Sequence, residues 1–345
     1  MKRIAIIGCG GSGKTALATQ LGGEARVAGA SSGPALLARG LAGDAAPVST
    51  FQQDDRSACD REPARGYRAF MDIIDAIVGG SRLVFVGAHP DDEVLIGPLL
   101  PFAASRSSAA VISVTNGQGG WNLAGNLAPR CLGEVRAAEF ERACAVTGAT
   151  GWLLGCTNGI STAHPEGVAV AEDEQAADRR WNAKGEWTPT PGEVVERWVR
   201  ERPGLVEEIR HRIASLAPCV VVSFEKDHGF TGHAEHRAVA LVMADVFAGL
   251  AGVTPAKVPA TLHHVIFPNH ARPDDVHVTV KRLDKIGRRD HLAIAMAAVS
   301  CYESQFGLRD SEQSARYLPS FVTLLQTMIF RPAAGTIDVP AAPGS

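Results

Sequence analysis

Short apolar runs alternate with amphipathic stretches over residues 83–330, and this alternation predicts the fold. Buried strands are expected at residues 83–86, 110–114, 152–154, 220–224, 262–267 and 276–280. Helical periodicity predicts helices at residues 93–104, 133–147, 194–216, 235–247, 283–304 and 317–330. Strands and helices in alternation indicate an α/β protein with a Rossmann-like, mostly parallel sheet that helices cover on both faces.

The hydrophobic pattern also divides the chain into regions. Residues 1–64 are expected to form a separate N-terminal arm, because beyond residue 22 they are rich in Ala, Gly and Ser and then polar, without strong periodicity. Residues 65–335 are predicted to form the main domain. Within it, residues 157–193 have no regular pattern and are interpreted as an insertion or lid. Residues 336–345 are expected to form a flexible tail.

Composition limits the classes of partner. The chain of 345 residues is 46% hydrophobic with a net charge of −3, which gives no electrostatic reason to expect nucleic acid or a membrane as partner. Its seven cysteines are scattered and never form a Cys-x-x-Cys pair, which favours a reducing compartment. The apolar stretch after Lys2 and Arg3 is too short for a signal peptide. A cytoplasmic protein is expected, and a homo-oligomer is left open.

The first candidate site directly follows the predicted strand 83–86, where Ala88–Glu93 reads Ala-His-Pro-Asp-Asp-Glu. Ligands of open parallel sheets bind beyond the carboxyl ends of the strands. A structural interpretation exists, because proline followed by acidic residues commonly opens a helix. A chemical interpretation notes imidazole and carboxylate within three residues. Adjacent Asp91 and Asp92 cannot both point at one ion from an extended turn, so one could bind metal while its neighbour faces a water molecule.

The second candidate site follows the predicted strand 220–224, where Gly232–His236 reads Gly-His-Ala-Glu-His. If a helix begins at residue 234, His233 and His236 lie three residues apart and share a face. A lone histidine is more often a surface or hydrogen-bonded core residue. Two histidines on either side of a carboxylate, at the edge where such sheets bind ligands, favour a role in metal binding.

Together the two clusters offer two histidines and one aspartate to a metal ion with one open coordination position, which is typical of catalytic zinc. Zinc lowers the pKa of bound water to about 7 and polarises a carbonyl group. The reaction then needs a base for the proton of water and an acid for the departing amine. Asp91 and His233 are candidates for these roles. The same ligands also accept iron or cobalt.

Both clusters resemble motifs of the LmbE-like family of zinc-dependent deacetylases, which includes the N-acetylglucosaminyl-phosphatidylinositol deacetylases (PIG-L). Ala88–Glu93 matches the first family motif completely, and Gly232–His236 matches Gly-His-Pro-Asp-His with Ala234 and Glu235 as replacements. Weaker agreement occurs at Thr115-Asn116-Gly117, Arg136, Glu139 and Ser304-Gln305. The resemblance covers about residues 80–330. It implies zinc-dependent hydrolysis of an N-acetyl amide on an amino sugar or small glycoside, in natural-product or thiol-conjugate biosynthesis for example, releasing acetate and a free amine.

The resemblance also implies a role for each matching residue. His89, Asp92 and His236 would bind one Zn²⁺ per chain, and Asp91 would be the general base. His233 would stabilise the oxyanion or act as an acid toward the leaving amine. A metal-binding module without catalysis is disfavoured, because Asp91 and His233 are both present.

Two glutamates are expected behind the metal ligands. Glu235 would orient a histidine, although the change from Asp to Glu leaves the identity of that histidine open. Glu93 would support the first motif. Some family members carry a tyrosine just before the Gly-His motif, whereas this chain has Thr231.

The expected substrate is a small N-acetylated molecule. Candidate substrate-binding residues are Asn116, Trp121, Asn122, Arg136, Trp181 and Trp187. The last two lie in the insertion, and long loops often cover active sites. They could stack on a sugar ring, but a plain surface excursion accounts for this segment equally well.

The N-terminus supports an alternative function. Gly8–Thr15 follows a short apolar run and satisfies the phosphate-loop pattern, with Gly13, Lys14 and Thr15 as candidate nucleotide-binding residues. A P-loop nucleotide-binding or kinase-like protein would also need a Walker-B carboxylate and a substantial sheet. Only weakly patterned residues follow, and the second histidine cluster would have no role. The deacetylase interpretation is therefore preferred.

Overall fold

The computed structural model describes residues 72–119, 129–158, 190–230, 232–252, 260–308 and 311–333, but not the side chains at 129–131, 251–252 and 311–317. The predictions for residues 1–64, for most of the insertion and for the tail lie outside these ranges. So do the candidate residues Trp121, Asn122, Trp181, Trp187, Gly13, Lys14 and Thr15.

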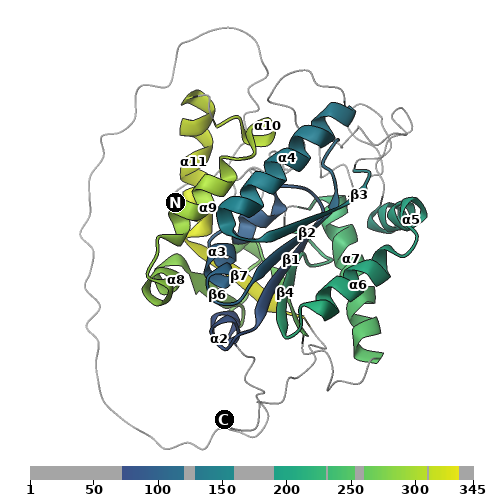
Figure 1. Cartoon of the computed structure of the whole chain (residues 1–345), viewed down its shortest axis with the longest axis horizontal. Helices are drawn as coiled ribbons and strands as arrows, with labels where there is room; N and C mark the ends of the chain where they lie inside the picture. Colours follow the sequence, from purple (N-terminus) through teal and green to yellow (C-terminus); the bar gives the residue numbers. More distant parts are fainter. Residues whose placement is uncertain are drawn as a thin grey trace, which may run out of the picture. The chain divides into compact units, whose positions relative to one another are not determined.

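A mixed sheet lies at the centre of the described part of the chain (Figure 1). Its seven strands have the order β3-β2-β1-β4-β5-β7-β6. Their bounds are β1 Arg82–Gly87, β2 Ala109–Thr115, β3 Thr150–Cys156, β4 Cys219–Ser223, β5 Ala260–Val265, β6 Val276–Thr279 and β7 Thr327–Pro332. Strands β1 to β5 pair in parallel, whereas β7 runs antiparallel to both β5 and β6. The prediction of a mostly parallel α/β sheet is confirmed.

Helices cover both faces of the sheet (Figure 1). Those beside β1, β2 and β3 are α3 Leu99–Ala104 and α4 Pro129–Thr147, with α9 His291–Val299 packed against both. The opposite face carries α5 Pro191–Glu201, α6 Leu205–Ser215 and α7 Ala234–Gly252. The other helices are α2 Ile73–Val78, α8 Val280–Gly287, α10 Glu303–Phe306, α11 Ser311–Leu325 and the 3₁₀ turns η1 Asp92–Ile96 and η3 Pro268–His270. None of the helices in the described ranges has the length and apolar character needed to span a membrane.

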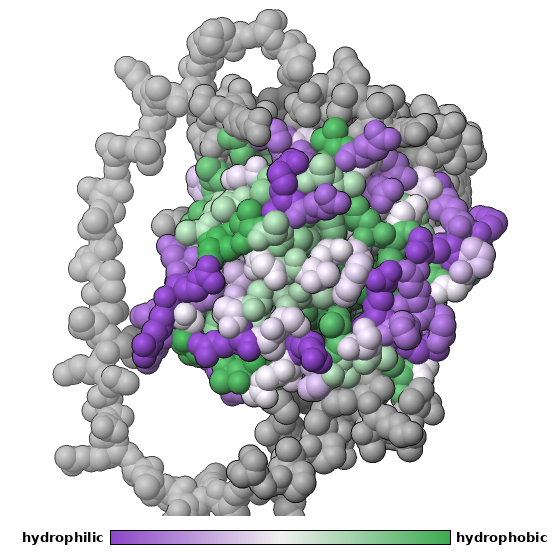
Figure 2. Space-filling view, viewed as in Figure 1, coloured by the Kyte–Doolittle hydropathy of each residue, from purple (hydrophilic) through white to green (hydrophobic). Residues whose placement is uncertain are grey.

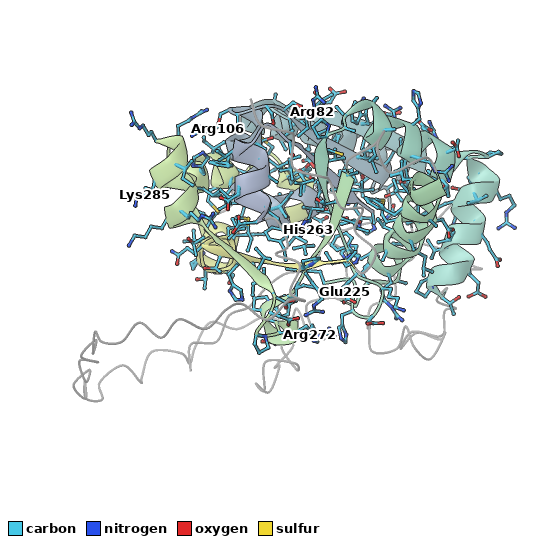
Figure 3. All side chains as sticks on the ribbon, turned by 90° about the horizontal axis from the view of Figure 1, so that it is seen from below. Arg82, Arg106, Glu225, His263, Arg272 and Lys285 are labelled. Atoms are coloured by element: carbon cyan, nitrogen blue, oxygen red, sulfur yellow. The ribbon has the colours of Figure 1, made fainter. Side chains whose placement is uncertain are left out.

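The central strands β1, β2 and β4 are apolar along nearly their whole length, because helices bury both of their faces. By contrast, hydrophilic side chains gather over α5 and α6 on the outside, on the right of Figure 2. The parallel register brings the carboxyl ends of neighbouring strands to one edge of the sheet. Figure 3 shows this polarity, with Arg82 and Arg106 at the amino ends and Glu225 and Arg272 on the opposite side.

Prolines and left-handed residues divide several helices that the periodicity predicted as continuous. Residues 93–104 form η1 and α3 instead of one helix, because Pro98 has no N–H group to donate within a helix. Residues 194–216 form α5 and α6 instead of one helix, and Pro203 lies between them. Residues 283–304 form three short helices, since Arg288 adopts a left-handed conformation (φ 53°) and Asp290 caps the next helix.

The end of the last predicted helix is wrong. Helix α11 stops at Leu325, and residues 327–332 form β7, which lies between β5 and β6. Met328, Ile329 and Phe330 are buried there. Apolar residues of this kind suit a strand between two neighbours, and that tertiary pairing overrides a short apolar pattern that fits either structure.

The packing of α4 on β3 gives a stability prediction. A Cβ atom at Gly151 would lie 2.5 Å from Phe140 Cε1 and 2.8 Å from Cys144 Sγ. We therefore expect Gly151→Ala to lower the free energy of unfolding by about 1–3 kcal/mol through overpacking. Urea unfolding measures the change. Gly192→Ala is the matched control, because its Cβ would meet Thr190 Oγ1 only at 4.0 Å. Equal stability of the two variants would contradict this prediction.

Candidate metal centre

The loop after β1 folds back so that Asp92 contacts the start of its own motif. Asp92 Oδ2 accepts hydrogen bonds from the backbone N–H groups of Ala88 (2.7 Å) and His89 (2.9 Å). Glycine at position 87 makes room for this fold, because a Cβ there would lie 2.8 Å from Asp92 Cβ. All of these residues are buried. The second oxygen, Oδ1, is thereby fixed on the side facing the histidines.

The second cluster, Gly232–His236, lies at the start of α7, beyond the carboxyl end of β4. The Nδ1 atom of His236 lies 2.9 Å from the carbonyl oxygen of Gly229. Since a carbonyl only accepts, Nδ1 carries the proton and the lone pair is on Nε2. The ring stacks on Phe224, with centroids 4.1 Å apart. These contacts direct His236 Nε2 to within 3.1 Å of Asp92 Oδ1.

His89 is oriented from the other cluster. Its Nε2 lies 2.6 Å from Glu235 Oε2, so the question of which histidine Glu235 contacts is answered. Its Nδ1 is buried, makes no hydrogen bond to any described residue, and lies 3.6 Å from Asp92 Oδ1. A carboxylate on one ring nitrogen with the other nitrogen facing inward is a common arrangement for a metal-binding histidine.

These atoms fit a metal ion. One ring nitrogen each of His89, His233 and His236 lies within 4.8 Å of the other two. Asp92 Oδ1 adds a fourth donor at the separations given above. Donors at about 2.1 Å from a tetrahedral ion are themselves about 3.4 Å apart. Imidazole and carboxylate are the ligands that zinc and related metals prefer.

The charges at this centre suit a cation. Burial alone would lower the pKa of His89, but the carboxylates of Asp92 and Glu235 raise it to about 10. Burial would likewise raise the pKa of Asp92, but His236 and His89 hold it well below its usual range. Burial and the two neighbouring imidazoles lower the pKa of His233, so its ring is neutral. Positive charge is thus stabilised around Asp92.

Asp91 has an unusual backbone at the edge of this centre. Its φ of 107° is in the left-handed region, which non-glycine residues rarely adopt. The side chain is fully buried, and neither carboxylate oxygen makes a hydrogen bond to a described residue. Burial therefore raises the pKa of Asp91 well above its usual range. Backbone strain together with a buried carboxylate that makes no hydrogen bond to a described residue is characteristic of functional sites.

Glu93 lies directly behind Asp91. Its Oε2 accepts a hydrogen bond from the Asp91 backbone N–H at 3.1 Å, and its Oε1 accepts one from the Tyr302 hydroxyl. Burial raises the pKa of Glu93 to about 7. The sequence interpretation missed Tyr302, because nothing in its neighbourhood marks a single tyrosine as a partner of a motif 209 residues away.

The weaker family motifs lie together in space. Arg136 on α4 donates a hydrogen bond to Gln305, and Glu139 accepts hydrogen bonds from Ser304 N (2.8 Å) and Oγ (2.6 Å). Gly117 lies against Arg136: a Cβ there would be 2.7 Å from Arg136 Nη1. Arg136 is buried, and its charge acts on Asp91. Of the candidate substrate-binding residues, Asn116 and Arg136 are described: Asn116 directly follows β2, and Arg136 acts on Asp91 of the metal centre's loop.

Comparison with known sequences identifies the family. Residues 84–247 match the sequence model of PIG-L, the GlcNAc-PI de-N-acetylases. This segment belongs to the PIG-L family. The match includes both histidine clusters and ends before the segment that carries Tyr302, Ser304 and Gln305. The family is typically metal-dependent, in agreement with the buried histidine cluster.

The chain also matches a curated relative. It is 27% identical over 175 residues to the 1D-myo-inositol 2-acetamido-2-deoxy-alpha-D-glucopyranoside deacetylase of Thermobifida fusca (strain YX). The match covers 48% of this chain and 54% of the relative, so the chain spans about half the length of that protein.

Two solved structures resemble the chain at low sequence identity. The N,N'-diacetylchitobiose deacetylase of Pyrococcus horikoshii is 13% identical with a TM-score of 0.49, covering 77% of this chain and 88% of its own. The 4-carboxy-2-hydroxymuconate hydratase of Pseudomonas putida KT2440 is 14% identical with a TM-score of 0.46, covering 76% and 100%. These two proteins have different activities, and neither likeness supports an assignment of function for this chain.

The contact between Glu235 and His89 predicts an effect on metal affinity. Removing the carboxylate by Glu235→Ala frees the imidazole to rotate, so we expect zinc affinity to fall about 10- to 100-fold. Glu235→Gln keeps an oxygen that can accept the hydrogen bond, so its zinc affinity should be closer to that of the unaltered protein. Competition with a fluorescent chelator measures both.

A matched control for this measurement is Glu207→Ala, which removes a carboxylate paired with Arg210 on the surface of α6. It should leave zinc affinity unchanged. Equal affinity of the Glu235→Ala variant and the unaltered protein would show that Glu235 does not orient a ligand.

Proposed function

We propose that this protein is a zinc-dependent N-deacetylase that binds one Zn²⁺ through His89, Asp92 and His236. The observation that carries the proposal is the convergence of three buried ligand atoms from two strand ends, His89 Nδ1, Asp92 Oδ1 and His236 Nε2. His233 is assigned a different role. Its Nδ1 accepts a hydrogen bond from the Glu235 backbone N–H at 3.2 Å, so the neutral ring carries its hydrogen on Nε2 and has no lone pair there for a metal.

A zinc ion bound there would supply a Lewis acid that polarises the acyl carbonyl and makes water more acidic. We assign Asp91 the role of general base, because its two oxygens make no hydrogen bond to a described residue and burial raises its pKa above its usual range. It would take the proton of the attacking water. The same carboxyl group could then protonate the departing amine, which would leave as a neutral molecule.

His233 is better suited to stabilising the oxyanion than to donating a full proton. Its Nδ1 acts as an acceptor and its ring is neutral, so Nε2 carries the hydrogen. A neutral imidazole N–H can donate a hydrogen bond to the carbonyl oxygen as that oxygen becomes negative. Of the two roles that the sequence left open, we propose the first.

The proposed substrate class is a small N-acetylated amino sugar or glycoside. Family membership of residues 84–247 and the amino-sugar substrate in the name of the Thermobifida relative support this class. Asn116 and Arg136 remain candidates for binding it, and the four candidates outside the described residues stay predictions. We further propose residues 65–335 as the catalytic domain, and a cytoplasmic location on the basis of the scattered cysteines.

Replacing the proposed base tests the activity. Asp91→Asn keeps the shape of the side chain but cannot accept a proton, so kcat for acetate release should fall about 10²- to 10⁴-fold while bound zinc is retained. The assay is acetate release from a panel of N-acetylated amino sugars. Full activity of this variant would refute the assignment of Asp91.

Metal removal tests the cofactor. Chelation should abolish acetate release, and restoring about one equivalent of zinc per chain should recover it. Metal analysis of the purified protein measures the stoichiometry. Activity that persists without any divalent metal would contradict the proposed function, and tight ATP binding that Lys14→Ala abolishes would favour the nucleotide-binding alternative.

A further inference from the structure

We propose that Tyr302 is a positioning residue that holds Asp91 in its reactive conformation through Glu93. The inference rests on the proposed function, because it concerns the residue assigned there as general base. It adds a residue from outside the segment that matches the PIG-L family, which ends at residue 247.

The position of the Asp91 carboxylate depends on its backbone. Neither of its oxygens makes a hydrogen bond to a described side chain or backbone group, so no such contact fixes the carboxylate directly. What fixes it is the turn itself, with φ at 107° and ψ at −15°. Such a conformation is unfavourable for a residue other than glycine and persists only where surrounding contacts hold it.

Two hydrogen bonds reach the backbone of Asp91: Val94 N–H donates to its carbonyl at 3.1 Å, and the side chain of Glu93 accepts from its N–H. Glu93 Oε2 accepts the Asp91 N–H at 3.1 Å. The side chain of Glu93 could otherwise rotate, but the Tyr302 hydroxyl donates to its other oxygen, Oε1. With both oxygens engaged, the carboxylate of Glu93 bridges the tyrosine and the strained turn.

Tyr302 is itself firmly held. Its backbone carbonyl accepts hydrogen bonds from the N–H groups of Gln305 (3.2 Å) and Phe306 (2.9 Å). Tyr302 is thus the N-cap residue of the short helix α10. Two residues further on, Ser304 binds Glu139 of α4 through both its N–H and its hydroxyl group. Tyr302 therefore belongs to a segment that hydrogen bonds hold against α4. Through Glu93, its hydroxyl restricts the movement of the Asp91 backbone.

The central test is Tyr302→Phe, which removes one oxygen and keeps the ring. We expect kcat to fall about 10- to 100-fold, because a small displacement of a base is enough to cause such a loss. KM and bound zinc should stay within about twofold, since the metal ligands are untouched. The matched control is Thr147→Val, which removes a buried hydroxyl that donates to the Ala143 and Cys144 carbonyls at the end of α4 and keeps the shape of the side chain. It should lower the melting temperature to a similar extent and leave kcat unchanged.

A double-mutant cycle tests whether Tyr302 acts through Glu93. If it does, Tyr302→Phe combined with Glu93→Ala should be no slower than Glu93→Ala alone. Multiplicative losses, or a wild-type kcat for Tyr302→Phe, would overturn the proposal.

A crystal structure of the Tyr302→Phe variant separates this inference from the proposed function. Asp91 should leave the left-handed region when the tyrosine hydroxyl is missing, whether or not a substrate has been found. If the unaltered protein releases no acetate from any substrate but Asp91 moves, the proposed function fails and the positioning role stands. If Asp91 keeps its conformation, the positioning role is wrong.

Discussion

The two oxygens of Asp92 connect the fold to the chemistry. One accepts two backbone hydrogen bonds from the start of its own loop, and the other faces the imidazoles of His89 and His236. A buried carboxylate is costly unless such partners compensate its charge. The centre therefore depends on the strands β1 and β4 lying side by side, because each delivers one of the histidines to this carboxylate.

The cost of burying so many charged groups is offset by a network that extends beyond the proposed metal ligands. Glu235 compensates His89, while Arg136 acts on the buried Asp91 from α4. Removing one member of such a network leaves another charge without compensation, which is why buried pairs are sensitive to single substitutions. The same network also favours a single conformation, because few other arrangements of these side chains would give every buried polar group a hydrogen-bond or charge partner.

The sequence predicted those parts of the fold and the site that leave a local signal. The apolar runs of β1 and β4 are short and buried on both faces, so their length and their polar flanks indicate strands, and each histidine cluster follows one of them. Strand β7 was mistaken for helix because its identity depends on pairing with β5 and β6. The partner of Glu235 was left open for a similar reason, because its contact with His89 joins two segments that are 146 residues apart in the sequence.

Tyr302 shows most clearly why distant contacts escape local interpretation. It follows the short helix α9, in a stretch that the periodicity predicts as one continuous helix. Only the breaks at Arg288 and Ser300 turn the segment so that residues 302–305 face α4 and Glu93. The departure from helical continuity is thus part of the site, because an unbroken helix would carry these side chains in a different direction. The match to the PIG-L model ends at residue 247, whereas Tyr302, from a segment beyond it, contacts Glu93 of the first motif.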